Sequence, residues 1–281
     1  MKIASLSCKD VNPNTTIDDH FAFKILEKSN IKVTQVLWDS DEDWKQFDLV
    51  IIRTTWDYTE RLEEFLNVLH KISLETKLIN SYDLIKWNAN KRYLIELEKL
   101  GIKIIPTLFR SEISIDEIKS LLNKTEYQDG LVIKPCVGAS SKNIQFIKSI
   151  DEFSSVPPSE WFIQPMQKMI QINGEFSLFF FDGEYSHAIN KLPKSGDYRC
   201  QEEYGSKITD WTPTESTIQM GYEILKKLPE IPSYARVDLL QNNSFEFQLI
   251  ELELIEPCLY IGFNANAPKN LAGMIKKALE H

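Results

Sequence analysis

The chain lacks the long apolar segments that mark membrane and secreted proteins. No run of about 18 apolar residues occurs among its 281 residues, and the opening residues lack the apolar core of a signal peptide. Its four cysteines show no CxxC or other metal-ligand spacing, so we expect reduced thiols and no disulfide framework. We therefore expect a cytoplasmic protein without a membrane partner.

An excess of positive charge is also absent. Lysine and arginine number 32 against 41 aspartates and glutamates, which gives a formal net charge of −9, and the basic residues form no run. Nucleic acids need a basic footprint that neutralises their phosphates, so no nucleic-acid partner is expected. The sequence contains no internal repeat, no Walker loop and no spacing typical of a Ser/His/Asp or Cys/His nucleophile. His187 by itself is more typical of a structural strand histidine than of a catalyst.

The first part of the chain alternates apolar strands with amphipathic helices. Strands are predicted at residues 2–7, 32–37 and 49–53, and helices at residues 18–29 and 60–71. This alternation predicts a parallel α/β layer over roughly residues 1–85. Residues 53–58, Arg-Thr-Thr-Trp-Asp-Tyr, follow a strand at its carboxyl end, where ligands bind in open α/β sheets. Further along, we expect a helix over residues 88–100 and a hairpin around Asp182-Gly183.

Two alternating runs near the C-terminus, residues 234–241 and 245–257, predict a β-hairpin. Arg236 and Asp238 share one face of the first strand, and Glu251 and Glu253 share one face of the second. The opposite face of the second strand is expected to carry Ile250, Leu252 and Leu254. Two carboxylates about 4 Å apart repel by roughly 4 kcal/mol at an effective dielectric constant of about 20, so their clustering predicts a cation. Hard oxygen ligands favour Mg²⁺, usually shared with phosphates. The alternative is an exposed hairpin face.

A small-residue loop follows a strand that ends at Lys134. Residues 138–143 read Gly-Ala-Ser-Ser-Lys-Asn, and such residues let backbone N–H groups approach phosphate oxygens. Residues 161–166, Trp-Phe-Ile-Gln-Pro-Met, form a strand that runs into Pro165, which cannot donate a backbone hydrogen bond to a neighbouring strand. Backbone groups there are therefore expected to be available to a purine ring. Each of these features has an alternative. The small-residue loop could be a simple turn and residues 161–166 a strand end. Lys91 could be a solvated lysine, and the polar stretch with Lys191 and Arg199 a surface loop.

Taken in order, these segments resemble the ATP-grasp superfamily of ADP-forming carboxylate–amine ligases. The branch that they resemble is that of the prokaryotic glutathione synthetase-like proteins, including the cycloserine-biosynthesis type. The order runs through Asn88-Ala-Asn-Lys, Val132-Ile-Lys-Pro, Ile163-Gln-Pro-Met, Asn173-Gly-Glu-Phe, Lys191-Leu-Pro-Lys, Ala235-Arg-Val-Asp and Glu251-Leu-Glu. One departure is the second carboxylate, because glutathione synthetases carry Glu-x-Asn where this chain has Glu251-Leu-Glu253. Substrate identity therefore does not carry over.

The resemblance implies an α/β (α+β) fold with three parts. These are an N-terminal parallel α/β domain (residues 1–87), a central lid (88–163) and a C-terminal antiparallel-sheet domain (164–281). It implies nucleotide contacts from Lys91, Lys134, Gly138, Ala139, Ser140, Ser141, Gln164, Pro165, Met166 and Glu175. It implies metal ligands at Asp238, Glu251 and Glu253, and a catalytic set of Arg236, Lys191 and Arg199.

The expected reaction joins a small-molecule carboxylate to an amine, such as an amino acid or short peptide. It uses ATP with Mg²⁺, or with Mn²⁺ as an alternative, and passes through an acyl phosphate to release ADP and phosphate. The rival hypotheses are an ATP-binding regulatory protein without turnover and a small-molecule kinase. We expect a monomer or homodimer. The closing Leu-Glu-His is typical of the start of a purification-tag remnant.

Overall fold

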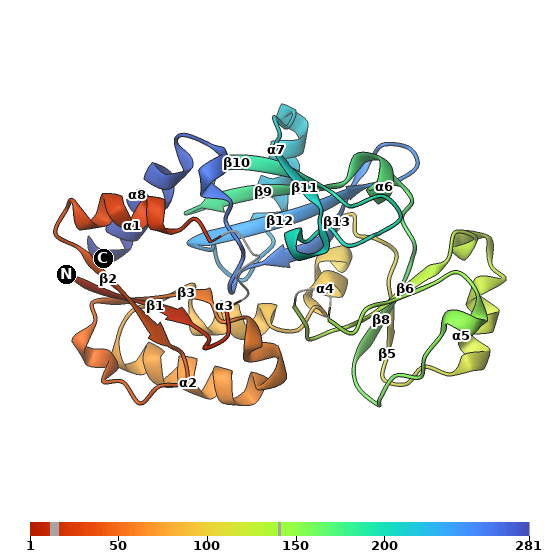
Figure 1. Ribbon diagram of the computed structural model, residues 1–281, viewed down its shortest axis with the longest axis horizontal. Helices are drawn as coiled ribbons and strands as arrows, with labels where there is room; N and C mark the ends of the chain where they lie inside the picture. The colour runs from red at the N-terminus through yellow and green to blue at the C-terminus, as the bar shows by residue number, and fades with distance from the viewer. Residues whose placement is uncertain (12–16, 140–141, 281) are drawn as a thin grey trace.

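The computed structural model describes residues 1–11, 17–139 and 142–280, whose strands form three sheets (Figure 1). The N-terminal sheet is parallel, with strand order β2-β1-β3-β4. Its strands are β1 (Lys2–Ser7), β2 (Lys32–Leu37), β3 (Leu49–Thr54) and β4 (Leu78–Ile79). Every residue of β3 is buried, as is typical of a parallel strand covered on both faces.

Two helices cover opposite faces of this sheet, α1 (His20–Glu27) and α2 (Leu62–Glu75). The α2 helix buries Phe65, Leu69 and Ile72, whose spacing places them on one helical face. The last helix, α8 (Ala267–Glu280), returns to lie beside α1, so the C-terminal residues pack against the N-terminal layer (Figure 1).

The second sheet is antiparallel, with strand order β5-β8-β6-β7. Its strands are β5 (Leu108–Arg110), β6 (Leu131–Pro135), β7 (Gln145–Ile147) and β8 (Trp161–Pro165). The helix α5 (Ile115–Leu122) packs Ile118 and Leu121 onto it, and the Ser114 hydroxyl caps that helix by accepting from Glu117 N–H at 3.1 Å. This sheet forms a separate lobe on the right of Figure 1.

The third sheet is also antiparallel, with strand order β11-β10-β9-β12-β13. Its strands are β9 (Glu175–Phe181), β10 (Glu184–Leu192), β11 (Lys207–Asp210), β12 (Tyr234–Gln241) and β13 (Phe247–Glu253). The helix α7 (Glu215–Leu225) lies close to this sheet at Gly221, where a Cβ would stand 2.4 Å from the Phe180 ring. The remaining α-helices are α3 (Tyr82–Asn88), α4 (Tyr93–Lys99) and α6 (Met169–Asn173). Short 3₁₀ turns lie at Trp44–Gln46, Trp56–Glu60, Thr125–Tyr127, Ile150–Glu152, Glu202–Tyr204 and Ile261–Phe263.

Most predicted elements are confirmed, but the helix expected over residues 88–100 is confirmed only in its second half, as α4. The chain turns between α3 and α4, because Lys91 N–H donates to the Cys136 carbonyl at 2.8 Å instead of continuing a helix. The hairpin at Asp182-Gly183 is confirmed, with φ of 51° and 77° as the twist of paired strands favours. Strands β4 and β11 and helices α3 and α6 were not predicted.

The expected domain limits stay predictions, and the limit between residues 163 and 164 falls inside β8. Of the closing residues, Leu279 and Glu280 belong to α8, while His281 lies outside the described residues. Within the described ranges, none of the helices has the length and apolar character needed to cross a membrane.

Candidate active site

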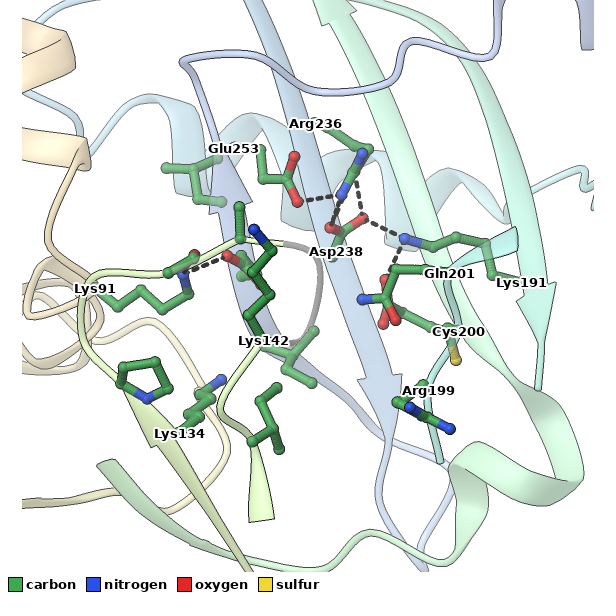
Figure 2. Close-up of a pocket in the computed structure, with 18 of the residues that line it drawn as sticks. Lys91, Lys134, Lys142, Lys191, Arg199, Cys200, Gln201, Arg236, Asp238 and Glu253 are labelled. Atoms are coloured by element: carbon green, nitrogen blue, oxygen red, sulfur yellow. Dashed lines mark hydrogen bonds and ion pairs between the residues drawn. The ribbon is translucent and has the colours of Figure 1, made fainter. Parts of the chain in front are cut away.

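A cavity of about 520 Å³ lies where the three parts of the chain meet, and it gathers the residues singled out in the sequence. Its lining includes Lys91, Lys134, Gly138, Ala139, Gln164, Pro165, Met166, Glu175, Lys191, Arg199, Arg236, Asp238, Glu251 and Glu253. Ser140 and Ser141, from the same expected set, lie outside the described residues. Residues as far apart in sequence as Lys91 and Glu253 therefore share one site (Figure 2).

The β12–β13 pair supplies the acidic floor of the cavity. Arg236 is opposite Glu253 and Asp238 is opposite Glu251 in the strand register, so the hairpin gathers these four side chains on one face, as predicted. The register shifts by one residue between Asp238 and the next position, so that the following pair joins Leu239 to Leu249. Because of this bulge, Ile250 lines the cavity and does not join the core face, where it was expected.

Each carboxylate of this floor is paired with a cation. Asp238 accepts from Arg236 at 3.0 Å and lies 3.5 Å from the Lys191 ammonium, and Arg236 also pairs with Glu253 (Figure 2). Glu251 lies 3.0 Å from the Lys91 ammonium. Across residues 1–11, 17–139 and 142–280, no group of three His, Cys, Asp or Glu side chains is placed to hold a metal ion. The predicted carboxylates are thus together in the cavity but are separated by basic side chains.

The donor chemistry of the floor nevertheless fits a hard divalent cation. Asp238, Glu251 and Glu253 offer carboxylate oxygens from two adjacent strands, the ligand type that Mg²⁺ takes beside phosphates. Burial raises the pKa of Glu253 to about 7, and the repulsion from Glu251 and Asp238 adds to this in spite of the neighbouring guanidinium. A bound cation would offset that surplus of negative charge.

Two lysines, half-buried Lys91 and buried Lys134, line the cavity beside the loop that follows β6. Lys91 donates to the Gly138 carbonyl at 2.6 Å, which ties the loop after β6 to the turn between α3 and α4. Lys134, at the end of β6, is 6% exposed, and within the described ranges no carboxylate lies within ion-pair distance of its ammonium. Burial lowers the pKa of Lys134 to about 8. An anionic ligand would restore its favourable environment.

The expected purine hinge lies on the cavity wall, but its backbone groups are already engaged. Met166 N–H donates to the Gly130 carbonyl at 2.9 Å, and the Pro165 carbonyl accepts from the Gln167 amide at 3.1 Å. The Gln164 side chain donates to the Thr107 hydroxyl at 2.8 Å. The expectation of free backbone groups is therefore wrong at Met166 N–H, because the strand pairing of β8 with β6 extends past the proline.

Lys191 and Arg199, predicted together as a polar stretch, have different environments. Lys191 is the penultimate residue of β10, is 5% exposed, and pairs with Glu175 as well as Asp238. Although burial opposes it, these two carboxylates raise the pKa of Lys191 above its usual value. Arg199 is paired with Asp197 at 2.7 Å and lies over the Tyr204 ring at 3.7 Å. The surface-loop alternative is thus wrong for Lys191.

Sequence reasoning missed several cavity residues, namely Asp10, Glu60, Tyr198, Glu256, Cys258 and Tyr260. Trp56, Asp57 and Tyr58 belong to the strand-end segment 53–58 that was expected to border a ligand, and Lys142 belongs to the expected phosphate loop; all four line the cavity. Glu256 had a weaker signal, as a carboxylate just beyond the two predicted metal ligands.

The chain was compared with known proteins. A family model described as the D-cycloserine synthetase DcsG N-terminal domain matches residues 3–80. The cycloserine biosynthesis protein DcsG of Streptomyces lavendulae is 29% identical over 265 residues, which is 86% of this chain and 87% of that protein.

Solved structures agree in fold. The crystal structure of D-cycloserine synthetase DcsG superposes with a TM-score of 0.84 at 24% identity, covering 99% of this chain and 100% of that one. A D-alanine–D-alanine ligase from Bacillus anthracis has a TM-score of 0.67 at 16% identity, over 100% of this chain and 96% of that one. The chain therefore has the fold of the ATP-grasp ligases and is similar in sequence to the cycloserine biosynthesis protein.

Proposed function

We propose that the chain uses ATP to convert the carboxylate of a small amino-acid-like substrate into an acyl phosphate. An amine then captures the acyl phosphate, and phosphate is released. The observation that carries this proposal is the meeting of cations and carboxylates in one cavity, whose two cysteines, Cys200 and Cys258, have pKa values raised by burial and are therefore poor nucleophiles. Phosphoryl transfer needs mainly positioning and charge stabilisation, and this is what such a set of residues supplies.

The basic residues divide into two groups by position. Lys91 and Lys134 face the loop after β6, where they would hold the ATP phosphates. Arg236 and Lys191 lie over the acidic floor, where they would neutralise the charge that develops on the transferred phosphoryl group. Arg199, at the rim, would contact the substrate carboxylate once its pairing with Asp197 is exchanged.

Asp238, Glu251 and Glu253 are the residues that would hold Mg²⁺, or Mn²⁺ in its place. When bound, the ion would offset phosphate charge and fix the orientation of the phosphate chain. The adenine ring would lie against Met166 and the apolar pair Leu240 and Ile250, which line the same cavity. Glu175 would lie close to the nucleotide through its contact with Lys191.

The size of the cavity favours a small substrate over a protein. A volume of about 520 Å³ is in the range that holds one drug-sized ligand, so little room remains beside a nucleotide. Serine derivatives that cyclise by forming a carbon–nitrogen bond are the first class to screen, because the relatives are named for cycloserine.

Release of ADP and phosphate over a panel of amino acids, serine derivatives and dipeptides tests the proposal. We expect Mg²⁺-dependent ADP release with at least one member, and formation of a hydroxamate when hydroxylamine is added, because hydroxylamine captures acyl phosphates and not phosphate esters. ADP release without hydroxamate would indicate a kinase. Nucleotide binding without ADP release over the whole panel would favour the regulatory alternative.

A further inference from the structure

Residues 254–259, between β13 and the turn at Ile261–Phe263, form an irregular segment along the cavity. Each of its six carbonyl oxygens accepts a hydrogen bond from a side chain. The donors are Asn80 to Leu254 at 2.8 Å, Tyr234 to Ile255 at 2.8 Å, Trp56 to Glu256 at 3.3 Å, Arg53 to Pro257 at 2.7 Å, Arg236 to Cys258 at 3.3 Å and His187 to Leu259 at 2.8 Å. A backbone without regular secondary structure is therefore fixed at every residue.

The Glu256 side chain extends from this segment into the cavity wall. It is 7% exposed. Throughout residues 1–11, 17–139 and 142–280, no cation lies within ion-pair distance of its carboxylate, and its own backbone N–H donates to it. The carboxylates of the cavity floor, buried Asp238 and half-buried Glu251 and Glu253, are each paired with a lysine or arginine.

A buried carboxylate without an ion-pair partner is unfavourable, and the attraction of the more distant Lys91 ammonium and one backbone N–H offset this only in part. Burial, with repulsion from Glu253, raises the pKa of Glu256 to about 8. Because the backbone carbonyls on both sides are tethered, the segment cannot swing the side chain into solvent without breaking several hydrogen bonds.

The nearby cations of the chain are committed elsewhere. The Lys91 ammonium contacts Glu251 and the Gly138 carbonyl, and the Arg53 guanidinium contacts Asp19 and the Pro257 carbonyl. A cationic group of a ligand in the cavity would supply the counter-charge that the described residues do not place beside Glu256.

We infer that Glu256 binds the amino group of the small-molecule substrate, so that the site distinguishes an amino acid from the corresponding hydroxy acid. The inference rests on the proposed function, because it places that amine in the same cavity as the carboxylate to be activated. Trp56 and Tyr58 line the same cavity, so the amine would lie between Glu256 and the N-terminal layer. Glu256 is thus a specificity-determining residue.

Calorimetry in the presence of Mg²⁺ and a non-hydrolysable ATP analogue tests this assignment. The probes are alanine and serine of both configurations, each matched with the hydroxy acid in which a hydroxyl replaces the amine, namely lactate and glycerate. We expect the wild type to prefer the amine of at least one pair by about 10- to 100-fold, the usual range for a hydrogen bond to a charged group. Glu256→Gln should abolish that preference, leave nucleotide affinity unchanged, and hold or raise the melting temperature.

Glu246→Gln, the same change at an exposed turn, is the matched control and should keep the preference. If Glu256→Gln still distinguishes amines from hydroxy acids, the assignment is wrong. It is equally wrong if the nucleotide analogue binds and none of the amines does. If the nucleotide analogue itself fails to bind, the proposed function is wrong, and the amine preference measured without nucleotide decides the role of Glu256 separately.

Discussion

Asp238 illustrates how single residues of the cavity are fixed by neighbours from different strands. Its carboxylate accepts from the Ser177 hydroxyl on β9 and the Arg236 guanidinium on its own strand, and it lies near the Lys191 ammonium of β10. Burial would raise the pKa of Asp238, but the two cations hold it below its usual value. The pairing with Arg236 two residues away was predictable from strand geometry, whereas Ser177 and Lys191 come from strands whose register the sequence did not specify.

Lys134 is the residue whose charge state should control nucleotide binding. Its pKa is lowered to about 8 in the folded chain against 10.5 for the ordinary side chain, so between these pH values the unfolded chain binds more protons. The free energy of unfolding of the ligand-free protein should therefore increase as the pH rises from about 8 to 10.5. Over the same range the affinity for an anionic ligand should fall, because the folded protein loses the charge of Lys134.

We expect Lys134→Met to weaken ATP binding by about 10- to 100-fold near pH 7. This deficit should shrink as the pH is raised beyond about 8, because the wild-type lysine then loses its own charge. Binding measured by calorimetry at several pH values checks this, with Lys134→Arg as the control that keeps a charge at all of them. A deficit that is the same at every pH would show that the ammonium charge is not what the nucleotide binds.

At the scale of elements, periodicity was enough wherever an element's own residues decide its form. The β12–β13 hairpin and its facing carboxylates follow from alternation, and Phe65, Leu69 and Ile72 of α2 follow from helical spacing. Prediction failed where a contact from a distant segment decides the conformation. The turn at Lys91 depends on the Cys136 carbonyl, and the exposure of Ile250 to the cavity depends on a bulge that no local signal marks.

Gly174, between α6 and β9, is an element boundary that only glycine fits. Its φ of 78° and ψ of −170° lie in a region that is essentially closed to other residues, and a Cβ would stand 2.6 Å from the Lys191 carbonyl oxygen. Gly174→Ala should cost at least about 1–3 kcal/mol from backbone strain alone. Since Glu175 follows directly and pairs with Lys191, turnover should also fall.

Urea unfolding of Gly174→Ala beside Gly273→Ala provides the comparison. Gly273 lies inside α8, where an added Cβ meets nothing within 4 Å, so alanine there should raise the free energy of unfolding by about 0.5–1 kcal/mol. Opposite signs for the two changes are expected. A loss of less than about 0.5 kcal/mol for Gly174→Ala would mean that this boundary relaxes and does not fix Glu175.

At the scale of the whole molecule, the three sheets are joined by side chains that cross between them. Asn80, just after β4, donates to the carbonyls of Tyr234 and Leu254, and the Tyr234 hydroxyl reaches the Ile52 carbonyl of β3 at 3.1 Å. These contacts connect residues more than 150 positions apart, as the separations of 154 and 182 residues show. They were not predictable from local patterns, because no sequence signal reports which distant carbonyl a buried asparagine or tyrosine reaches.

An exposed ion pair joins the loop of small residues after β6 to the N-terminal layer. Lys142 of that loop lies 2.9 Å from Glu60, and the two side chains are 57% and 65% exposed (Lys142 is labelled in Figure 2). The loop itself was predicted to close over phosphates; two of its residues, 140 and 141, lie outside the described residues. The ion pair suggests a test of lid closure that uses only described residues.

Exposed pairs contribute about 0.2–1 kcal/mol, so Lys142→Ala or Glu60→Ala should weaken ATP binding by no more than about fivefold at low salt. The double reversal, Glu60→Lys with Lys142→Glu, should restore most of the loss, and high salt should remove the difference between all variants because it screens exposed charges. Hydrogen exchange of β6 and the residues up to Ala139, with and without Mg-ATP, should show less protection by nucleotide in each single variant.

Lys103→Ala is the matched control. Lys103 and Glu246 form an ion pair of similar exposure, with a length of 3.3 Å, that lies outside the cavity. If Lys103→Ala and Lys142→Ala change ATP affinity equally, the pair between Lys142 and Glu60 has no part in closure. The hydrogen bond from Lys91 to the Gly138 carbonyl is then left as the contact that draws the loop over the nucleotide.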